Sequence, residues 1–228
     1  MASPTVIAID GPSASGKSST AAAVAGQLGM IHLDTGALYR ALTWLALDRG
    51  LDDAAMIVEA ADANSLHLTL RDRRLVVVAG EDEADIEERI RSERVTAGVS
   101  ALASLPEVRS WVNRRLRVAV RATGGAVLDG RDIGTVVFPD AALKVFLTAS
   151  AESRARRRLV QRGAEPSAEK VRHEAELLAA RDRLDAARKE APLRQAHDAI
   201  LLDTTDLGFE AQVARIVGLA RQRGLPLG

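Results

Sequence analysis

The sequence contains no cysteine, which excludes disulfide bonds and thiolate metal sites. Its four histidines are scattered and show no spacing typical of metal ligands. No apolar run reaches the ~18 residues that a membrane-spanning helix requires, so we expect no membrane attachment. The opening residues, Met-Ala-Ser-Pro, lead directly into an apolar stretch without a signal-peptide pattern, and we therefore expect a cytoplasmic protein.

Lysine is scarce as well, because only four of the 31 basic residues are lysines and the others are arginines. The 31 acidic residues balance them, so the formal net charge is zero. A neutral chain is not suited to strong non-specific binding to nucleic acids or acidic membranes. We therefore expect small-molecule partners and no nucleic acid, and arginine suits bidentate recognition of phosphate groups. No helix pattern leaves a large apolar face over, which favours a monomer.

A glycine-rich segment, Gly11–Ser18, has the spacing of a phosphate-binding loop: a glycine, four residues, then Gly-Lys-Ser. The apolar run Val6–Asp10 before it has the length of a strand, and the alanine-rich stretch Ser19–Leu28 after it favours a helix. In that setting the N–H groups of the loop and the helix N-terminus form a concave anion site. We expect Lys17 to bridge the β- and γ-phosphates of a nucleoside triphosphate and the Ser18 hydroxyl to ligate Mg²⁺.

The wider pattern favours an α/β fold built on a doubly wound, five-stranded parallel sheet. Short apolar segments separated by helical patterns are typical of parallel strands that are covered on both faces. The predicted core strands are Val6–Asp10, Met30–Leu33, Ala126–Asp129, Leu143–Leu147 and Ala199–Leu202. The carboxyl ends of parallel strands meet at one edge of a sheet, and we expect the nucleotide to bind at that edge.

One stretch departs from this core pattern. Ser65–Leu70 alternates apolar and polar side chains, Arg71-Asp72-Arg73 can form a turn, and Arg74–Ala79 is β-branched and apolar, which together predict an antiparallel hairpin. Ser104 is a candidate cap between two of the helices that are predicted to follow, and those helices are Asp85–Arg91, Ser92–Ser104 and Pro106–Arg121. We therefore expect a P-loop core domain of residues 1–34 and 123–228, and an insert domain of residues 35–122 that stands off the sheet.

Two charged motifs follow predicted strands and are expected at the edge where the nucleotide binds. In Asp34-Thr35-Gly36-Ala37-Leu38-Tyr39-Arg40, Thr35 can cap the next helix, and Arg40 lies one turn into it, within reach of a phosphate. The segment Asp129-Gly130-Arg131-Asp132 follows the third strand, where phosphate-loop proteins usually place a carboxylate that organises Mg²⁺. The alternatives are a plain helix cap in the first motif and a structural Arg–Asp pair in the second.

Two further charged segments lie in the C-terminal half. Arg181, Asp185 and Arg188 recur at spacings of four and three, which places them on one face of a predicted helix. Such a triplet fits a binding site or an ordinary ion pair worth a few tenths of a kcal/mol, and the residues alone leave both interpretations open. The arginines at 154–158 fit either a solvated helix face or a phosphate-binding lid near residues 154–168.

Five motifs in order resemble the bacterial cytidylate kinase family, whose members phosphorylate CMP and dCMP. They are the phosphate loop, Asp-Thr-Gly-Ala-Leu-Tyr-Arg, Ile-Arg-Ser with Val-Ser and Pro-Glu-Val-Arg, Asp-Gly-Arg-Asp-Ile-Gly-Thr-Val-Val-Phe-Pro-Asp-Ala, and Arg-Asp-x-x-Asp-x-x-Arg. The Asp-Gly-Arg-Asp and Ile-Arg-Ser blocks are more specific to that family than the phosphate loop is. One departure is Leu116, where family members often carry glutamine.

The resemblance implies a set of roles for residues of this chain. ATP would be held at its phosphates by Gly11, Pro12, Ser13, Ala14, Ser15, Gly16, Lys17, Ser18 and Ser19, with Arg154, Arg157 and Arg158 in a short mobile lid. The base of CMP would contact Thr35, Ser100, Arg109 and Asp132. The ribose would be held by Arg181 and Asp185, and the acceptor phosphate by Arg40, Arg131 and Arg188, with Asp129 nearby. Lys17, Arg40, Arg131 and Arg188 would then support catalysis, and Ser18 would bind Mg²⁺.

Two other classes of protein stay open at this point. A different phosphate-loop kinase would act on AMP, UMP or a metabolite alcohol, and an alcohol would need a general base. A switch or motor NTPase would act through a macromolecular partner. The sequence has no Asn-Lys-x-Asp motif for guanine and no Asp-Glu pair at the end of the third predicted strand, so this second class is disfavoured.

Overall fold

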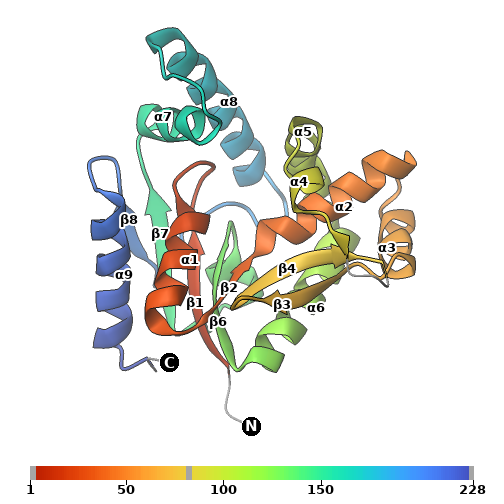
Figure 1. Cartoon of the computed structure of the whole chain (residues 1–228), viewed down its shortest axis with the longest axis horizontal. Coiled ribbons are helices and arrows are strands. Elements are labelled where there is room, and N and C mark those ends of the chain that lie inside the picture. The colour runs from red at the N-terminus through yellow and green to blue at the C-terminus, as the bar shows by residue number, and fades with distance from the viewer. Residues whose placement is uncertain (1–3, 81–83, 226–228) are drawn as a thin grey trace. The chain divides into compact units, whose positions relative to one another are not determined.

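The computed structural model, drawn in Figure 1, describes residues 4–80 and 84–225. The chain divides into two compact units. One unit, here called the P-loop unit, consists of Thr5–Met30 and Val127–Gly228. The other, here called the hairpin unit, contains Ile31–Ala126. Within the part of the chain that the structure describes, no helix is both long enough and apolar enough to span a membrane.

The P-loop unit contains four neighbouring strands in the order β6-β1-β7-β8. They are β1 (Thr5–Asp10), β6 (Gly125–Gly130), β7 (Leu143–Thr148) and β8 (Ile200–Asp203). β7 pairs in parallel with both β1 and β8, as the alternation of strands and helices predicts. The helices of this unit are α1 (Lys17–Leu28), α7 (Ala151–Gln161), α8 (Ala168–Ala186) and α9 (Phe209–Gln222).

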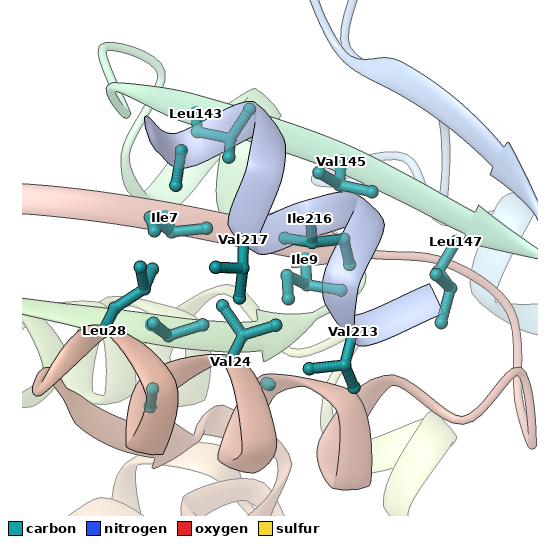
Figure 2. Packing of buried hydrophobic residues seen from close by; sticks show 14 residues of the cluster. Ile7, Ile9, Val24, Leu28, Leu143, Val145, Leu147, Val213, Ile216 and Val217 are labelled. Atoms are coloured by element: carbon teal, nitrogen blue, oxygen red, sulfur yellow. The ribbon is translucent and has the colours of Figure 1, made fainter. Parts of the chain in front are cut away.

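The core of the P-loop unit lies between its strands and the two helices α1 and α9, as Figure 2 shows. Ile7 and Ile9 of β1 are fully buried against Val24 of α1 and Ile216 of α9. Burying an aliphatic side chain of this size contributes about 1.5–3 kcal/mol. Because these contacts fix β1 against α1, they help to hold in place the loop that joins the two elements.

The hairpin unit combines short strands with five helices in its described residues. The strands are β2 (Ile31–Asp34), β3 (His67–Arg71), β4 (Arg74–Ala79) and β5 (Ala84–Asp85). The helices are α2 (Thr35–Arg49), α3 (Ala54–Ala63), α4 (Glu87–Ile90), α5 (Glu93–Leu102) and α6 (Pro106–Thr123). β3 and β4 form the predicted antiparallel hairpin, and the turn at Asp72 and Arg73 has positive φ at both residues.

The hairpin does not stand apart from the core strands as the sequence pattern suggested. β4 pairs in parallel with β2, with His32 opposite Arg74 and Leu33 opposite Leu75. The apolar residues of β4 explain this pairing, because Leu75 and Val77 are buried. The prediction treated the alternation as a sign of a local β element, whereas a strand that is buried in this way can also join a neighbouring strand.

Three local predictions about helix ends were wrong. The predicted helix Asp85–Arg91 is reduced to the four residues of α4. Ser104 does not cap α6, because its hydroxyl donates to the carbonyl of Ala101 at 2.6 Å and Pro106 occupies the first turn, where no N–H is needed. Thr35 does not cap α2, because the helix starts at Thr35 itself, directly after β2.

Candidate nucleotide-binding site

The phosphate loop runs from the end of β1 to the start of α1, as the motif predicts. A side chain at Gly11 is excluded, because a Cβ there would lie 2.0 Å from the backbone oxygen of Leu147. Gly16 has φ 90° and precedes a helix that has no side-chain cap at its N-terminus. The loop therefore presents the glycine turn and the helix N-terminus that an anion site requires.

Lys17 is folded into the loop and is only 5% exposed. Its Nζ atom donates to the carbonyl of Pro12 at 2.6 Å and to the hydroxyl of Ser15 at 3.3 Å. Burial lowers the pKa of Lys17 well below its usual value, and the nearby charge of Arg131 lowers it further, against the opposing effect of Asp129. A polyanion bound in the loop would supply the negative charge that this buried ammonium lacks.

Ser18 and Asp129 bring a hydroxyl and a carboxylate together. The Ser18 hydroxyl donates to Asp129 Oδ2 at 2.5 Å, so the first turn of α1 meets the end of β6. Mg²⁺ prefers oxygen ligands and usually binds through one or two protein groups together with phosphates and waters. The donor set of this pair fits such an ion.

Asp10, at the end of β1, is a buried carboxylate directly before the phosphate loop that the sequence interpretation did not single out. Its two carboxylate oxygens accept the N–H groups of Ile133 at 2.9 Å and Gly134 at 2.8 Å. These amides open a five-residue π-helix, η1 (Ile133–Val137), which directly follows Asp132. Burial raises the pKa of Asp10 to about 6, against the lowering effect of the two amides. An acidic residue that ends a buried strand was the signal used for Asp129, and it would have identified Asp10 too.

Arg131 and Arg188 meet at the buried carboxylate of Asp185. Arg131 Nε lies 2.9 Å from Asp185 Oδ2, and one guanidinium nitrogen of Arg188 lies 2.5 Å from Oδ1. The prediction that all three residues of the triplet share a helix face was wrong for Arg188, because α8 ends at Ala186. The side chain of Arg188 still pairs with the carboxylate of Asp185, although Arg188 lies beyond the end of α8.

The remaining predicted residues of the P-loop unit have varied surroundings. Arg154 is buried on α7 and donates to the carbonyl of Ser13 at 2.8 Å. Arg157 donates to the hydroxyl of Thr204 at 2.9 Å, and Arg158 to Gln161 at 3.0 Å. Asp132 is buried at the start of η1, and Arg181 is half-buried on α8. The mobility of the predicted lid stays a prediction.

In the hairpin unit, the predicted residues sit on three helices. Arg40 on α2 donates to the hydroxyl of Thr96 at 2.9 Å. Arg109 on α6 is 4% exposed, donates to the carbonyl of Ala103 at 3.1 Å and has its guanidinium 5.6 Å from the ring centre of Tyr39. The other two predicted residues, also buried, are Thr35 and Ser100.

An ion pair that was not predicted lies at the start of α2. Arg91 lies 3.1 Å from Asp34 Oδ2 and 2.5 Å from Glu87. This pairing explains why Asp34, which occupies the N-cap position of α2, makes no side-chain cap bond. The Ile-Arg-Ser motif therefore contributes an arginine that orients the Asp-Thr-Gly turn.

The phosphate loop holds a buried lysine and lies beside a hydroxyl–carboxylate pair. Two arginines pair with one carboxylate in the same unit. This combination is typical of a phosphotransferase of the P-loop class. A family model described as cytidylate kinase matches residues 7–222. The chain belongs to the cytidylate kinase family and is thus an enzyme of the nucleoside monophosphate kinase class.

The similar curated proteins are of two lengths. The cytidylate kinase of Geobacillus thermodenitrificans is 46% identical over 223 residues, which cover 95% of this chain and 96% of the relative. The cytidylate kinase of Stutzerimonas stutzeri is 46% identical, with 96% of each chain covered. A bifunctional pantoate ligase/cytidylate kinase of a Synechococcus species is 48% identical over 95% of this chain, but the chain spans only 41% of that longer protein.

Solved structures support the fold. TT1252 from Thermus thermophilus has a TM-score of 0.52 at 18% identity, with 97% of this chain and 98% of that chain covered. An uncharacterized protein from Eubacterium ventriosum has a TM-score of 0.54 at 10% identity, with 96% and 99% covered. At such identities the likeness concerns the α/β architecture alone.

Proposed function

We propose that this chain transfers the γ-phosphoryl group of ATP to the phosphate of CMP or dCMP, giving ADP and CDP or dCDP. The observation that carries the proposal is the gathering of Arg131 and Arg188 on Asp185 in the same unit as the phosphate loop. A nucleotide kinase needs one group of cations for the donor phosphates and another for the acceptor phosphate. Membership of the cytidylate kinase family supports ATP as the donor and a cytidine nucleotide as the acceptor.

On the donor side, the loop Gly11–Ser19 binds the phosphates of ATP through Lys17 and the backbone N–H groups at its helix end, since the N–H of Ser13 is held by Asp182. The chemistry that Mg²⁺ would supply when bound is positive charge that neutralises the phosphates of ATP. The Ser18 hydroxyl would hold the ion, with Asp129 orienting that hydroxyl through their 2.5 Å hydrogen bond. Arg157 and Arg158 assist at the ATP phosphates.

On the acceptor side, Arg131 and Arg188 bind the phosphate of CMP, and Arg40 is a third ligand for it. The ribose hydroxyls are held by Asp185 and Arg181. Asp185 keeps its charge, because the charges of Arg131 and Arg188 outweigh the effect of burial and lower its pKa. The carboxylate can therefore hold both arginines in place before any nucleotide binds.

The base of the acceptor is recognised by Thr35, Ser100, Arg109 and Asp132. Cytosine presents an exocyclic amine donor and ring acceptors, and a carboxylate together with a hydroxyl and a guanidinium matches that edge. Ser100, Arg109 and Asp132 are buried, so water would compete little with a base that binds to them.

Chemistry at this site needs no general base, because the attacking oxygen belongs to an anionic phosphate. The barrier is the approach of two polyanions. Two unit charges 4 Å apart interact by roughly 4 kcal/mol at an effective dielectric of 20. Lys17, Arg131 and Arg188 would offset this repulsion and hold the reacting groups in line. We expect the enzyme to act as a monomer in the cytoplasm.

The test is ADP release from ATP–Mg²⁺ with CMP, dCMP, UMP, AMP and GMP offered separately. Turnover with CMP and dCMP, and none with the purine nucleotides, is the expected result. Activity only with AMP or UMP would show that the acceptor is that nucleotide and not CMP or dCMP. Steady ATP hydrolysis without any acceptor would contradict the proposal and favour a switch-type NTPase.

A further inference from the structure

Ser13, in the middle of the phosphate loop, has all three of its polar groups held by other segments of the P-loop unit. Its N–H donates to Asp182 Oδ1 at 2.8 Å, and its carbonyl accepts from Arg154 at 2.8 Å. Its hydroxyl accepts from Arg131 at 3.0 Å. Ser13 is 3% exposed, so water does not compete for these bonds. The loop is therefore tied to α7, to α8 and to the segment after β6.

Asp182 contributes to the first two of these contacts, because it accepts from the N–H of Ser13 and pairs with Arg154. Its second carboxylate oxygen lies 2.5 Å from a guanidinium nitrogen of Arg154, and the two side chains are 15% and 10% exposed. The carboxylate of Asp182 therefore accepts from the N–H of Ser13 through one oxygen and pairs with Arg154 through the other. Arg154 in turn donates to the carbonyl of Ser13. Charge-assisted bonds in such a sheltered position are stronger and less screened than surface ion pairs.

The contacts close into a ring. Asp182 and Asp185 lie on the same helix, α8, and Asp185 accepts from Arg131 at 2.9 Å. Arg131 in turn donates to the hydroxyl of Ser13, whose N–H returns to Asp182. Two routes therefore connect the phosphate loop to α8, one through Asp182 directly and one through Arg131 and Asp185. A shift of α8 or Arg131 would therefore change the hydrogen bonds that hold Ser13 in position.

We propose that Asp182 is a positioning residue that couples the phosphate loop to the arginine cluster, so that binding of CMP and binding of ATP strengthen each other. This inference rests on the proposed function, which places the acceptor on Arg131 and Asp185. An acceptor nucleotide that binds these two side chains would contact the same groups that hold Ser13 in position. Coupling between two ligands is reciprocal, and it requires a physical connection that both ligands bias.

The experiment measures the Kd of adenylyl imidodiphosphate with Mg²⁺, alone and with saturating CMP, by calorimetry. In the wild-type protein we expect CMP to tighten analogue binding by about fivefold or more, within the usual range of coupling. In Asp182→Asn the ratio of the two Kd values should fall to below about twofold, and in Asp182→Ala to about one. The asparagine can still accept from Ser13 but no longer pairs with the charge of Arg154.

Arg183→Ala is the matched control, because Arg183 lies on the same helix and is exposed. It should keep the wild-type ratio. If Asp182 were only structural, its variants would weaken both Kd values equally and leave the ratio unchanged, which would overturn the proposal. A wild-type ratio of one would overturn it as well. If the wild-type protein did not bind CMP at all, both the coupling and the proposed function would be wrong.

Discussion

Asp185 accepts hydrogen bonds from two arginines at once, Arg131 at 2.9 Å and Arg188 at 2.5 Å, through its two separate oxygens. The carboxylate is 1% exposed. It therefore brings two like charges to one carboxylate and compensates both.

Asp185→Asn should remove the countercharge from both arginines. We expect the KM for CMP to rise by at least tenfold, and unfolding to become easier by about 3–5 kcal/mol, because removing one member of a buried ion pair leaves the other uncompensated. Since the pKa of Asp185 is lowered in the fold, its stabilisation is present above its unfolded-state pKa and is lost as the pH falls through the folded value. Urea unfolding of both proteins from pH 7 to pH 3 checks this, and equal pH dependence would contradict it.

Ser18→Ala should remove a hydroxyl that is proposed to hold Mg²⁺. We expect kcat to fall by about a hundredfold or more, because the charge on the transferred phosphoryl group is then less well neutralised. Binding of ATP without Mg²⁺ should change little. Ser104→Ala, which removes an exposed hydroxyl on the hairpin unit, is the control and should keep full activity. Equal Mg²⁺ dependence in the Ser18 variant and the wild-type protein would argue against this assignment.

Arg40→Ala and Arg188→Ala should each lower kcat far more than they weaken ATP binding. We expect a loss in kcat of about 10²–10³, since each removes a cation proposed to hold the acceptor phosphate. Arg156→Ala is a matched arginine control, because Arg156 pairs only with the exposed Glu152 among the contacts described for it. Steady-state kinetics with ATP and CMP varied separately distinguish the two effects. Near-normal turnover in both variants would rule out the acceptor clamp.

Asp10 should give the protein an unusual pH dependence. Its folded-state pKa is about 6 against an ordinary 3.8, so its contribution to stability is fully present below 3.8 and is lost as the pH rises through 6. The wild-type protein should therefore lose about 2 kcal/mol relative to Asp10→Asn between pH 4 and pH 7. Denaturant titrations of both proteins across this range measure the difference. A constant difference would show that burial does not disfavour the charged form.

The sequence was informative where a motif dictates local geometry. The phosphate loop, its flanking strand and helix, and the five core strands follow from apolar runs and glycine spacing, and all are present within a residue or two. The meeting of Arg131 with Asp185 joins residues 54 positions apart. Only the family resemblance suggested that they belong to one site.

The missed features depend on contacts that no local pattern encodes. The parallel pairing of β4 with β2 brings His32 beside Arg74, and nothing in the alternation of the hairpin specifies that partner. Asp182 looks like an ordinary charged residue on a solvated helix until its bond to the Ser13 amide is seen. Such side-chain to backbone bonds depend on the tertiary fold, which propensity and periodicity do not describe.

In the proposed reaction, the γ-phosphoryl group passes from ATP to a cytidine nucleotide. The most direct measurement incubates the protein with ATP labelled at the γ-phosphate, Mg²⁺ and CMP, and follows the label by chromatography. We expect the label to appear in CDP at the rate at which ADP forms, with dCMP giving labelled dCDP. Label released as free phosphate at the same rate with or without CMP would contradict the claim.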